Sequence, residues 1–121
     1  MLKPEELAAF KRGARRRWQE EQHALTQRRE RAWQLARSAA QLLKEQFGAT
    51  RVVVFGSLTH EGRFTPWSDV DIAAWGLKKE DTFRAIGAVM DLDNQIALNL
   101  VDVNTCRPEI VAVIEREGVE L

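Results

Sequence analysis

The chain has 121 residues, of which 45% are hydrophobic and 30% are charged. This composition predicts a single globular chain and excludes disordered and fibrous proteins. No apolar run approaches the length of about 18 residues that a membrane span needs, and the first residues lack the apolar core of a signal peptide, so we expect a cytoplasmic protein without a membrane segment. The single cysteine, Cys106, excludes an intramolecular disulfide and a cysteine-built zinc site. The sequence contains no tyrosine.

The formal net charge is zero, but the charge is unevenly divided along the chain. Residues 1–48 contain 11 Lys and Arg against 6 Glu, whereas residues 49–121 contain 7 Lys and Arg against 12 Asp and Glu. We therefore divide the chain into a basic N-terminal arm, residues 1–48, and an acidic domain, residues 49–121. The division indicates two roles or two partners.

Strong helix formers dominate the arm, and its apolar residues recur at three- and four-residue spacing. This pattern predicts one amphipathic helix, or two helices with a break near Gln22-His23. The apolar stripe is sparse in the first half, so we expect that half to contact another chain or to fold back weakly. The fuller stripe from Ala32 to Phe47 should dock on a sheet, and Gly48 should form a left-handed C-terminal cap.

After Gly48 the pattern changes to short β-branched runs separated by turns. Strands are predicted at residues 51–55, 69–75 and 96–103, with a turn and short helical segment at 58–68 and helices at 80–92 and 108–117. The fold class is therefore α/β or α+β, a mixed sheet flanked by helices with a long N-terminal helical arm.

Three carboxylates fall on two of the predicted strands. Asp69 and Asp71 share one face of their strand because residues i and i+2 point the same way. Asp102 lies on the next strand, and we expect its neighbours Val101 and Val103 to face the core. Unit charges 4 Å apart repel by about 4 kcal/mol at an effective dielectric of about 20. A hard divalent cation such as Mg²⁺ or Mn²⁺ would relieve that repulsion.

Gly56 and Ser57 lie where the first predicted strand ends. A glycine there allows close approach of a ligand, and backbone N–H groups with a hydroxyl suit a phosphate. A phosphate site beside a carboxylate cluster indicates a nucleoside-triphosphate site.

These residues carry a family resemblance. The runs Val54-Phe55-Gly56-Ser57, Ser68-Asp69-Val70-Asp71-Ile72 and Val101-Asp102-Val103 resemble the DNA polymerase beta nucleotidyltransferase superfamily, and most of all the minimal nucleotidyltransferases that act as antitoxins beside HEPN-type toxins. The resemblance covers residues 51–121. The family pattern has ten residues between Gly-Ser and Asp-x-Asp, whereas eleven separate Ser57 from Asp69 here.

The resemblance implies an enzyme that uses ATP and two Mg²⁺ ions. Asp69, Asp71 and Asp102 would ligate the metals and be catalytic, and Gly56 and Ser57 would hold the β- and γ-phosphates. AMP would pass to a protein hydroxyl, in active relatives a tyrosine of the partner toxin. The loop residue Arg63 could neutralise triphosphate charge, or it could simply be solvated.

Two other interpretations remain open. The domain could be a non-catalytic interaction protein that binds a partner and forms a homo-oligomer through residues 1–48. Transfer to a small molecule ranks lower, because the chain is short for a separate acceptor domain. The basic residues of the arm are interrupted by Glu20, Glu21 and Glu30, so the sequence favours a solvated helical face over a nucleic-acid interface.

Overall fold

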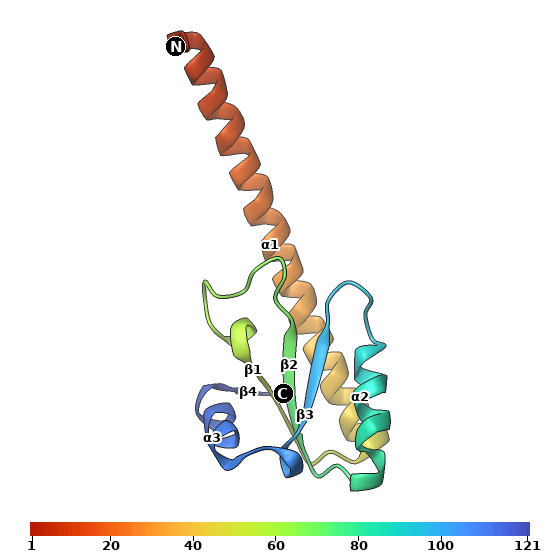
Figure 1. The fold of residues 1–121 in the computed structure, drawn as a ribbon. Helices are drawn as coiled ribbons and strands as arrows, with labels where there is room; N and C mark the ends of the chain where they lie inside the picture. Colours follow the sequence, from red (N-terminus) through yellow and green to blue (C-terminus); the bar gives the residue numbers. More distant parts are fainter.

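A single long helix dominates the first third of the chain in the computed structural model, which describes residues 1–121. Helix α1 (Pro4–Phe47) is continuous, so of the two predicted alternatives the structure has the single helix and not the pair with a break near Gln22-His23. Proline occupies its first turn, and Gly48 caps its C-terminus in the left-handed conformation (φ 69°), as predicted. Figure 1 shows that the N-terminal half of α1 projects away from the rest of the molecule.

Four strands form one mixed sheet in the order β3-β2-β1-β4. Strands β1 (Arg51–Phe55) and β2 (Val70–Trp75) are antiparallel, and β3 (Leu98–Asp102) runs parallel to β2. The three predicted strands are therefore confirmed, the first with the predicted bounds and the other two slightly shorter. A two-residue strand, β4 (Val119–Glu120), pairs antiparallel with β1 and was not predicted.

The remaining helices are short. The segment after β1 is a 3₁₀ turn, η1 (Gly56–Thr59), and α2 (Thr82–Met90) follows a second such turn, η2 (Lys79–Asp81). After β3 come the 3₁₀ turn η3 (Val103–Thr105) and α3 (Pro108–Glu117), which begins on its proline.

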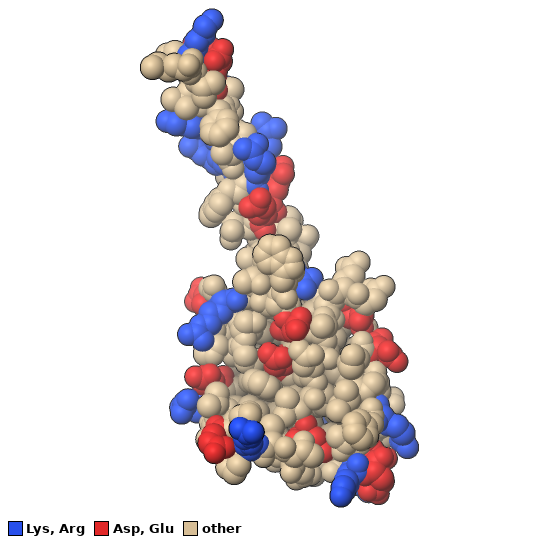
Figure 2. Space-filling view, viewed as in Figure 1, with Lys and Arg blue, Asp and Glu red and all other residues tan.

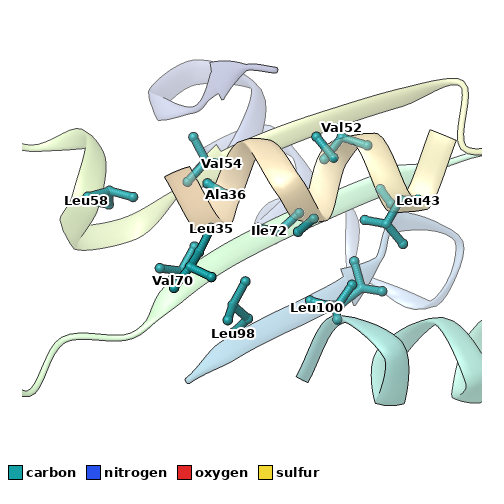
Figure 3. Packing of buried hydrophobic residues seen from close by; sticks show 14 of the residues in the cluster. Leu35, Ala36, Leu43, Val52, Val54, Leu58, Val70, Ile72, Leu98 and Leu100 are labelled. Atoms are coloured by element: carbon teal, nitrogen blue, oxygen red, sulfur yellow. The ribbon is translucent and has the colours of Figure 1, made fainter. Parts of the chain in front are cut away.

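Helices α1 and α2 cover one face of the sheet, and α3 packs on the other (Figure 1). The main core lies under α1, where alternate strand residues meet the stripe of the helix (Figure 3). The residues of α1 that lie in this core are Ala32, Leu35, Ala36, Ala39, Ala40 and Leu43. Small alanines let the helix approach the sheet closely, so the second half of the arm docks as predicted.

A smaller core lies on the opposite face of the sheet. It consists of Val53, Ala73 and Ile114, with Trp75 and Val103 packed at its edge. Since strand residues alternate between faces, this cluster identifies the α3 side of β1 and β2.

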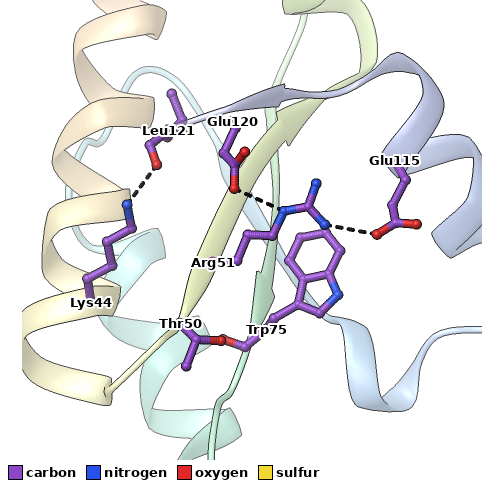
Figure 4. A network of polar contacts seen from close by, with 7 residues as sticks. All are labelled: Lys44, Thr50, Arg51, Trp75, Glu115, Glu120 and Leu121. Atoms are coloured by element: carbon purple, nitrogen blue, oxygen red, sulfur yellow. Dashed lines mark hydrogen bonds and ion pairs between the residues drawn. The ribbon is translucent and has the colours of Figure 1, made fainter.

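Polar contacts tie the C-terminus to β1 and α1 (Figure 4). The guanidinium of Arg51 donates to Glu115 at 2.8 Å and to Glu120 at 3.1 Å, and it lies 4.4 Å from the ring centroid of Trp75. Lys44 donates to the carbonyl of Leu121 at 2.7 Å. These bonds hold β4 against β1.

The projecting half of α1 keeps its apolar residues uncovered. Leu7, Phe10 and Trp18 are exposed to 40%, 61% and 60%. Figure 2 shows many Lys and Arg side chains along this part of the helix, interspersed with acidic ones. No helix in the chain has an apolar stretch long enough for a membrane crossing.

Candidate functional site

The carboxylates of Asp69 and Asp71 both accept a hydrogen bond from one side chain on the neighbouring strand. Asp69 directly precedes β2 and Asp71 lies within it, on the α3 side of the sheet. Asp71 is paired in register with Asn99 of β3. The side-chain amide of Asn99 donates to Asp69 Oδ2 at 3.2 Å and to Asp71 Oδ1 at 3.3 Å. The two carboxylates are therefore gathered around a single nitrogen, as their spacing predicts.

The two aspartates differ in their surroundings. Asp69 is exposed, whereas Asp71 is half-buried. Burial raises the pKa of Asp71, the hydrogen bond from Asn99 lowers it, and the charge of Asp69 raises it again, with a net upward shift. A cation between the two carboxylates would stabilise the charged form that burial disfavours.

The absence of a side chain at Gly56 leaves room for the carboxylate of Asp71. Phe55 pairs with Asp71 across β1 and β2, so Gly56, which directly follows β1, lies beside the aspartate. A β-carbon built on Gly56 would lie 2.5 Å from Asp71 Oδ2, and the backbone there has a φ of 80°. Both facts require glycine. The Gly-Ser motif and the Asp-x-Asp motif are thus in contact.

Ser57 and Arg63 belong to the segment that leads away from Gly56. Ser57 is half-buried at the start of η1, and its carbonyl accepts from the His60 amide at 3.2 Å. Arg63 is exposed, near the glycine at position 62, whose φ is also 80°. Ser57 is next to Gly56 in the chain, but no hydrogen bond joins the side chain of Ser57 or of Arg63 to the two aspartates.

The prediction that Asp102 joins Asp69 and Asp71 is wrong. Asp102 shares its face with Leu98 and Leu100, on the α1 and α2 side of the sheet. It is only 4% exposed, and it accepts from the Thr82 hydroxyl at 2.8 Å and from the Asn104 amide at 3.0 Å. Its carboxylate is thus a buried anchor between α2 and η3.

The expectation that Val101 and Val103 face the core is wrong for the main core. Val101 and Val103 are only half-buried and lie on the α3 side, where Val103 borders the smaller core. The alternation of the strand places Asp102, rather than the valines, toward the main core.

Asn99 is the site residue that the sequence interpretation missed. It lies between the buried Leu98 and Leu100, so the apolar alternation from residue 96 to 100 marks it as the polar residue on the opposite face. That signal was available in the sequence. Its pairing with Asp71 depends on the strand register, which the sequence does not reveal.

The side chains of this site provide some, but not all, of the ligands that a divalent cation needs. The two carboxylates are hard ligands of the kind that Mg²⁺ accepts, whereas the amide of Asn99 turns its nitrogen, which cannot ligate a cation, toward them. No group of three or more His, Cys, Asp or Glu side chains is arranged so that it could hold a metal ion by itself. Asp69 and Asp71 would therefore hold such an ion together with oxygen ligands from substrate or water.

Solved structures share this fold. Two are variants of the toxin–antitoxin complex MntA–HpeT, with TM-scores of 0.56 and 0.57 at 18% and 20% identity; the likeness covers 70% of this chain and 70% and 69% of the matched chains. A third is the tri-AMPylated Shewanella oneidensis HEPN toxin in complex with MNT antitoxin, with a TM-score of 0.54 at 17% identity over 74% of this chain and 70% of that one.

At this level of identity the likeness concerns the fold. No protein-family model matches the sequence, and no curated protein matches it either. The mixed sheet, the flanking helices and the contact between Gly56 and Asp71 agree with the resemblance seen in the sequence motifs. The chain therefore has the fold of the minimal, antitoxin-type nucleotidyltransferases.

Proposed function

We propose that this chain is a nucleotidyltransferase that moves AMP from ATP to a hydroxyl group of a partner protein, and that the partner is a HEPN-type toxin that it neutralises. The observation that carries the proposal is the contact between the two motifs, where Gly56 leaves room for the carboxylate of Asp71. The relatives with this fold include one solved with a tri-AMPylated toxin.

Each residue of the site has a role in this proposal. Asp69 and Asp71 would hold a divalent cation, Mg²⁺ by ligand type, and Asn99 would orient both carboxylates through its amide. Gly56 and Ser57 would receive the β- and γ-phosphates. When bound, the cation would neutralise phosphate charge and align the attacking and leaving oxygens.

The proposed reaction is an in-line substitution at phosphorus. The acceptor hydroxyl would lose its proton to water and form a new bond to the α-phosphorus, while the bond from that phosphorus to the α–β bridging oxygen breaks and pyrophosphate leaves. Arg63 has no contact that fixes it elsewhere, so its role in screening the triphosphate stays a prediction. Asp102 takes no part, since it lies buried on the other face of the sheet.

The test uses labelled ATP, Mg²⁺ and the product of the neighbouring gene as acceptor. We expect label on the partner with the wild-type chain and none with Asp69→Asn or Asp71→Asn. Asp91→Asn, an exposed aspartate at the end of α2, is the matched control and should keep full transfer. Because this chain lacks tyrosine, any tyrosine-linked AMP must belong to the partner. Equal labelling by all four chains would refute the proposal.

A second candidate function is non-catalytic, with the projecting part of α1 pairing two copies of the chain. It is favoured by the exposure of Leu7, Phe10 and Trp18 along one stripe of the projecting half of α1, which packs against nothing in its own chain. Sedimentation should then show an oligomer that Trp18→Glu weakens and the adjacent Gln19→Glu leaves intact. A monomeric wild-type chain would exclude this role for the arm.

A further inference from the structure

Two consecutive arginines of α1 reach the loop that joins the two site motifs. Arg28 Nη2 donates to the carbonyl of Ser68 at 3.3 Å, and Arg29 Nη2 donates to the carbonyl of Leu58 at 3.3 Å. Ser68 directly precedes Asp69, and Leu58 directly follows Ser57. One helical turn therefore holds both ends of the loop 58–68.

The other side-chain hydrogen bonds of this loop each join residues near the same end of it. Near the second end, the Ser68 hydroxyl accepts from the Thr65 amide at 2.8 Å. Near the first end, the Thr59 hydroxyl donates to the carbonyl of Gly56 at 2.9 Å. These bonds shape the turns locally, whereas the arginines fix the two ends to the same rigid element.

Packing between α1 and the loop is incomplete. Surface cavities of about 500 and 310 Å³ lie between them, the first lined by Arg29, Gly62 and Phe64 and the second by Arg28 and Pro66. Hydrogen bonds across this gap, together with the buried side chains of the loop, therefore set its position relative to the helix. Hydrogen bonds from a charged donor are stronger and more directional than neutral ones.

An arginine at position 28 is less favourable for the stability of the fold than an apolar side chain of similar length would be. Its Nε is buried without a hydrogen-bond partner, and a buried donor without a partner opposes folding. An unbranched apolar side chain such as methionine could cover the same stem without that cost. What methionine could not do is bond to the carbonyl of Ser68.

We propose that Arg28 and Arg29 are positioning residues that hold Ser57 and Asp69 in register from α1. This inference rests on the proposed nucleotide site and extends it into the arm. The eleven-residue spacing between the motifs makes the anchorage important, because a longer loop samples more conformations when its ends are released.

Hydrogen–deuterium exchange of the full chain tests this role, with peptides that span residues 56–71. We compare Arg28→Met and Arg29→Met with Arg37→Met, an exposed arginine of the same helix. Exchange in residues 56–71 should be faster by about threefold to tenfold in the first two variants and unchanged in the third, with the unfolding midpoint of Arg28→Met preserved. Arg28→Lys, which keeps a donor, should restore part of the protection.

Affinity for MgATP, measured by titration calorimetry, supplies the second readout. The two loop-anchoring variants should bind MgATP more weakly than Arg37→Met does. Exchange equal to that of the control would overturn the inference, as would faster exchange with unchanged affinity. If the wild-type chain binds no MgATP, the proposed function fails separately, and exchange alone then decides whether the arginines hold the loop.

Discussion

The carboxylate of Asp71 occupies the space that a side chain on residue 56 would need. Gly56 directly follows β1, the antiparallel neighbour of the strand that carries Asp71, and a β-carbon on Gly56 would come within 2.5 Å of Asp71 Oδ2. The end of one strand and the start of the next therefore form one site. A substitution at Gly56 should disturb Asp71 first and the rest of the fold second.

Gly56→Ala should separate this steric effect from backbone strain. Gly62 has the same φ of 80°, but a β-carbon there would meet nothing within 4 Å, so Gly62→Ala is a matched control. Each substitution should lower the free energy of unfolding by about 1–2 kcal/mol through left-handed strain. Only Gly56→Ala should also weaken MgATP binding, by about tenfold or more, because the carboxylate is displaced. Equal affinities in the two variants would contradict this interpretation.

Asp71→Asn should stabilise the metal-free fold at neutral pH. Burial raises the pKa of Asp71 above its unfolded value, so the stability that its protonated form contributes is lost as the pH rises through the folded pKa. The stability difference between Asp71→Asn and wild type should therefore grow as the pH rises above about 4, the ordinary pKa of an aspartate. Urea unfolding in EDTA measures it. A difference that does not change with pH would show that burial is not the cause.

The contribution of Asp93 to stability should depend on pH in the opposite direction. Backbone amides of Ile96 and Gln95, with a smaller contribution from Arg31, lower the pKa of Asp93. Its contribution is present above the unfolded pKa and is lost as the pH falls through the folded pKa. Asp93→Asn should thus destabilise the chain at neutral pH and have less effect in acid. Thermal unfolding across that range measures the change, with the exposed Asp91→Asn as control.

Asp102→Asn should reduce stability and leave the site intact. The carboxylate accepts from Thr82 and Asn104 inside the fold, so loss of its charged hydrogen bonds should lower the free energy of unfolding by about 1–3 kcal/mol. Thr82→Val should have a similar effect, and the double variant should cost less than the sum, because both remove the same bond. Binding of Mn²⁺ should be unchanged in all three. Loss of Mn²⁺ binding in Asp102→Asn would contradict this prediction and show that Asp102 belongs to the metal site.

Local sequence signals predicted most of the fold. Helix spacing identified the stripe from Ala32 to Leu43 that packs on the sheet, and β-branched runs identified three strands. Gly48 and Pro108 marked the helix ends at which they occur. Strand β4 was missed because two residues carry no periodicity.

The candidate site was only partly predictable. Spacing alone places Asp69 and Asp71 on one face of their strand. To place Asp102, one must also know which face of β3 its side chain occupies. Leu98 and Leu100 alternate with Asn99, and this shows that residue 102 lies on the apolar side. The position of Arg28 and Arg29 beside the loop could not be predicted, because it depends on how α1 crosses the sheet.

The most direct test of the nucleotide site is titration of MgATP into the full chain, with Asp69→Asn/Asp71→Asn as the paired variant. We expect saturable, Mg²⁺-dependent binding to the wild-type chain and its loss in the variant, which keeps a folded circular-dichroism spectrum. Equal binding by the two proteins, or no binding by the wild type, would contradict the claim that these carboxylates and Gly56 form a nucleotide site.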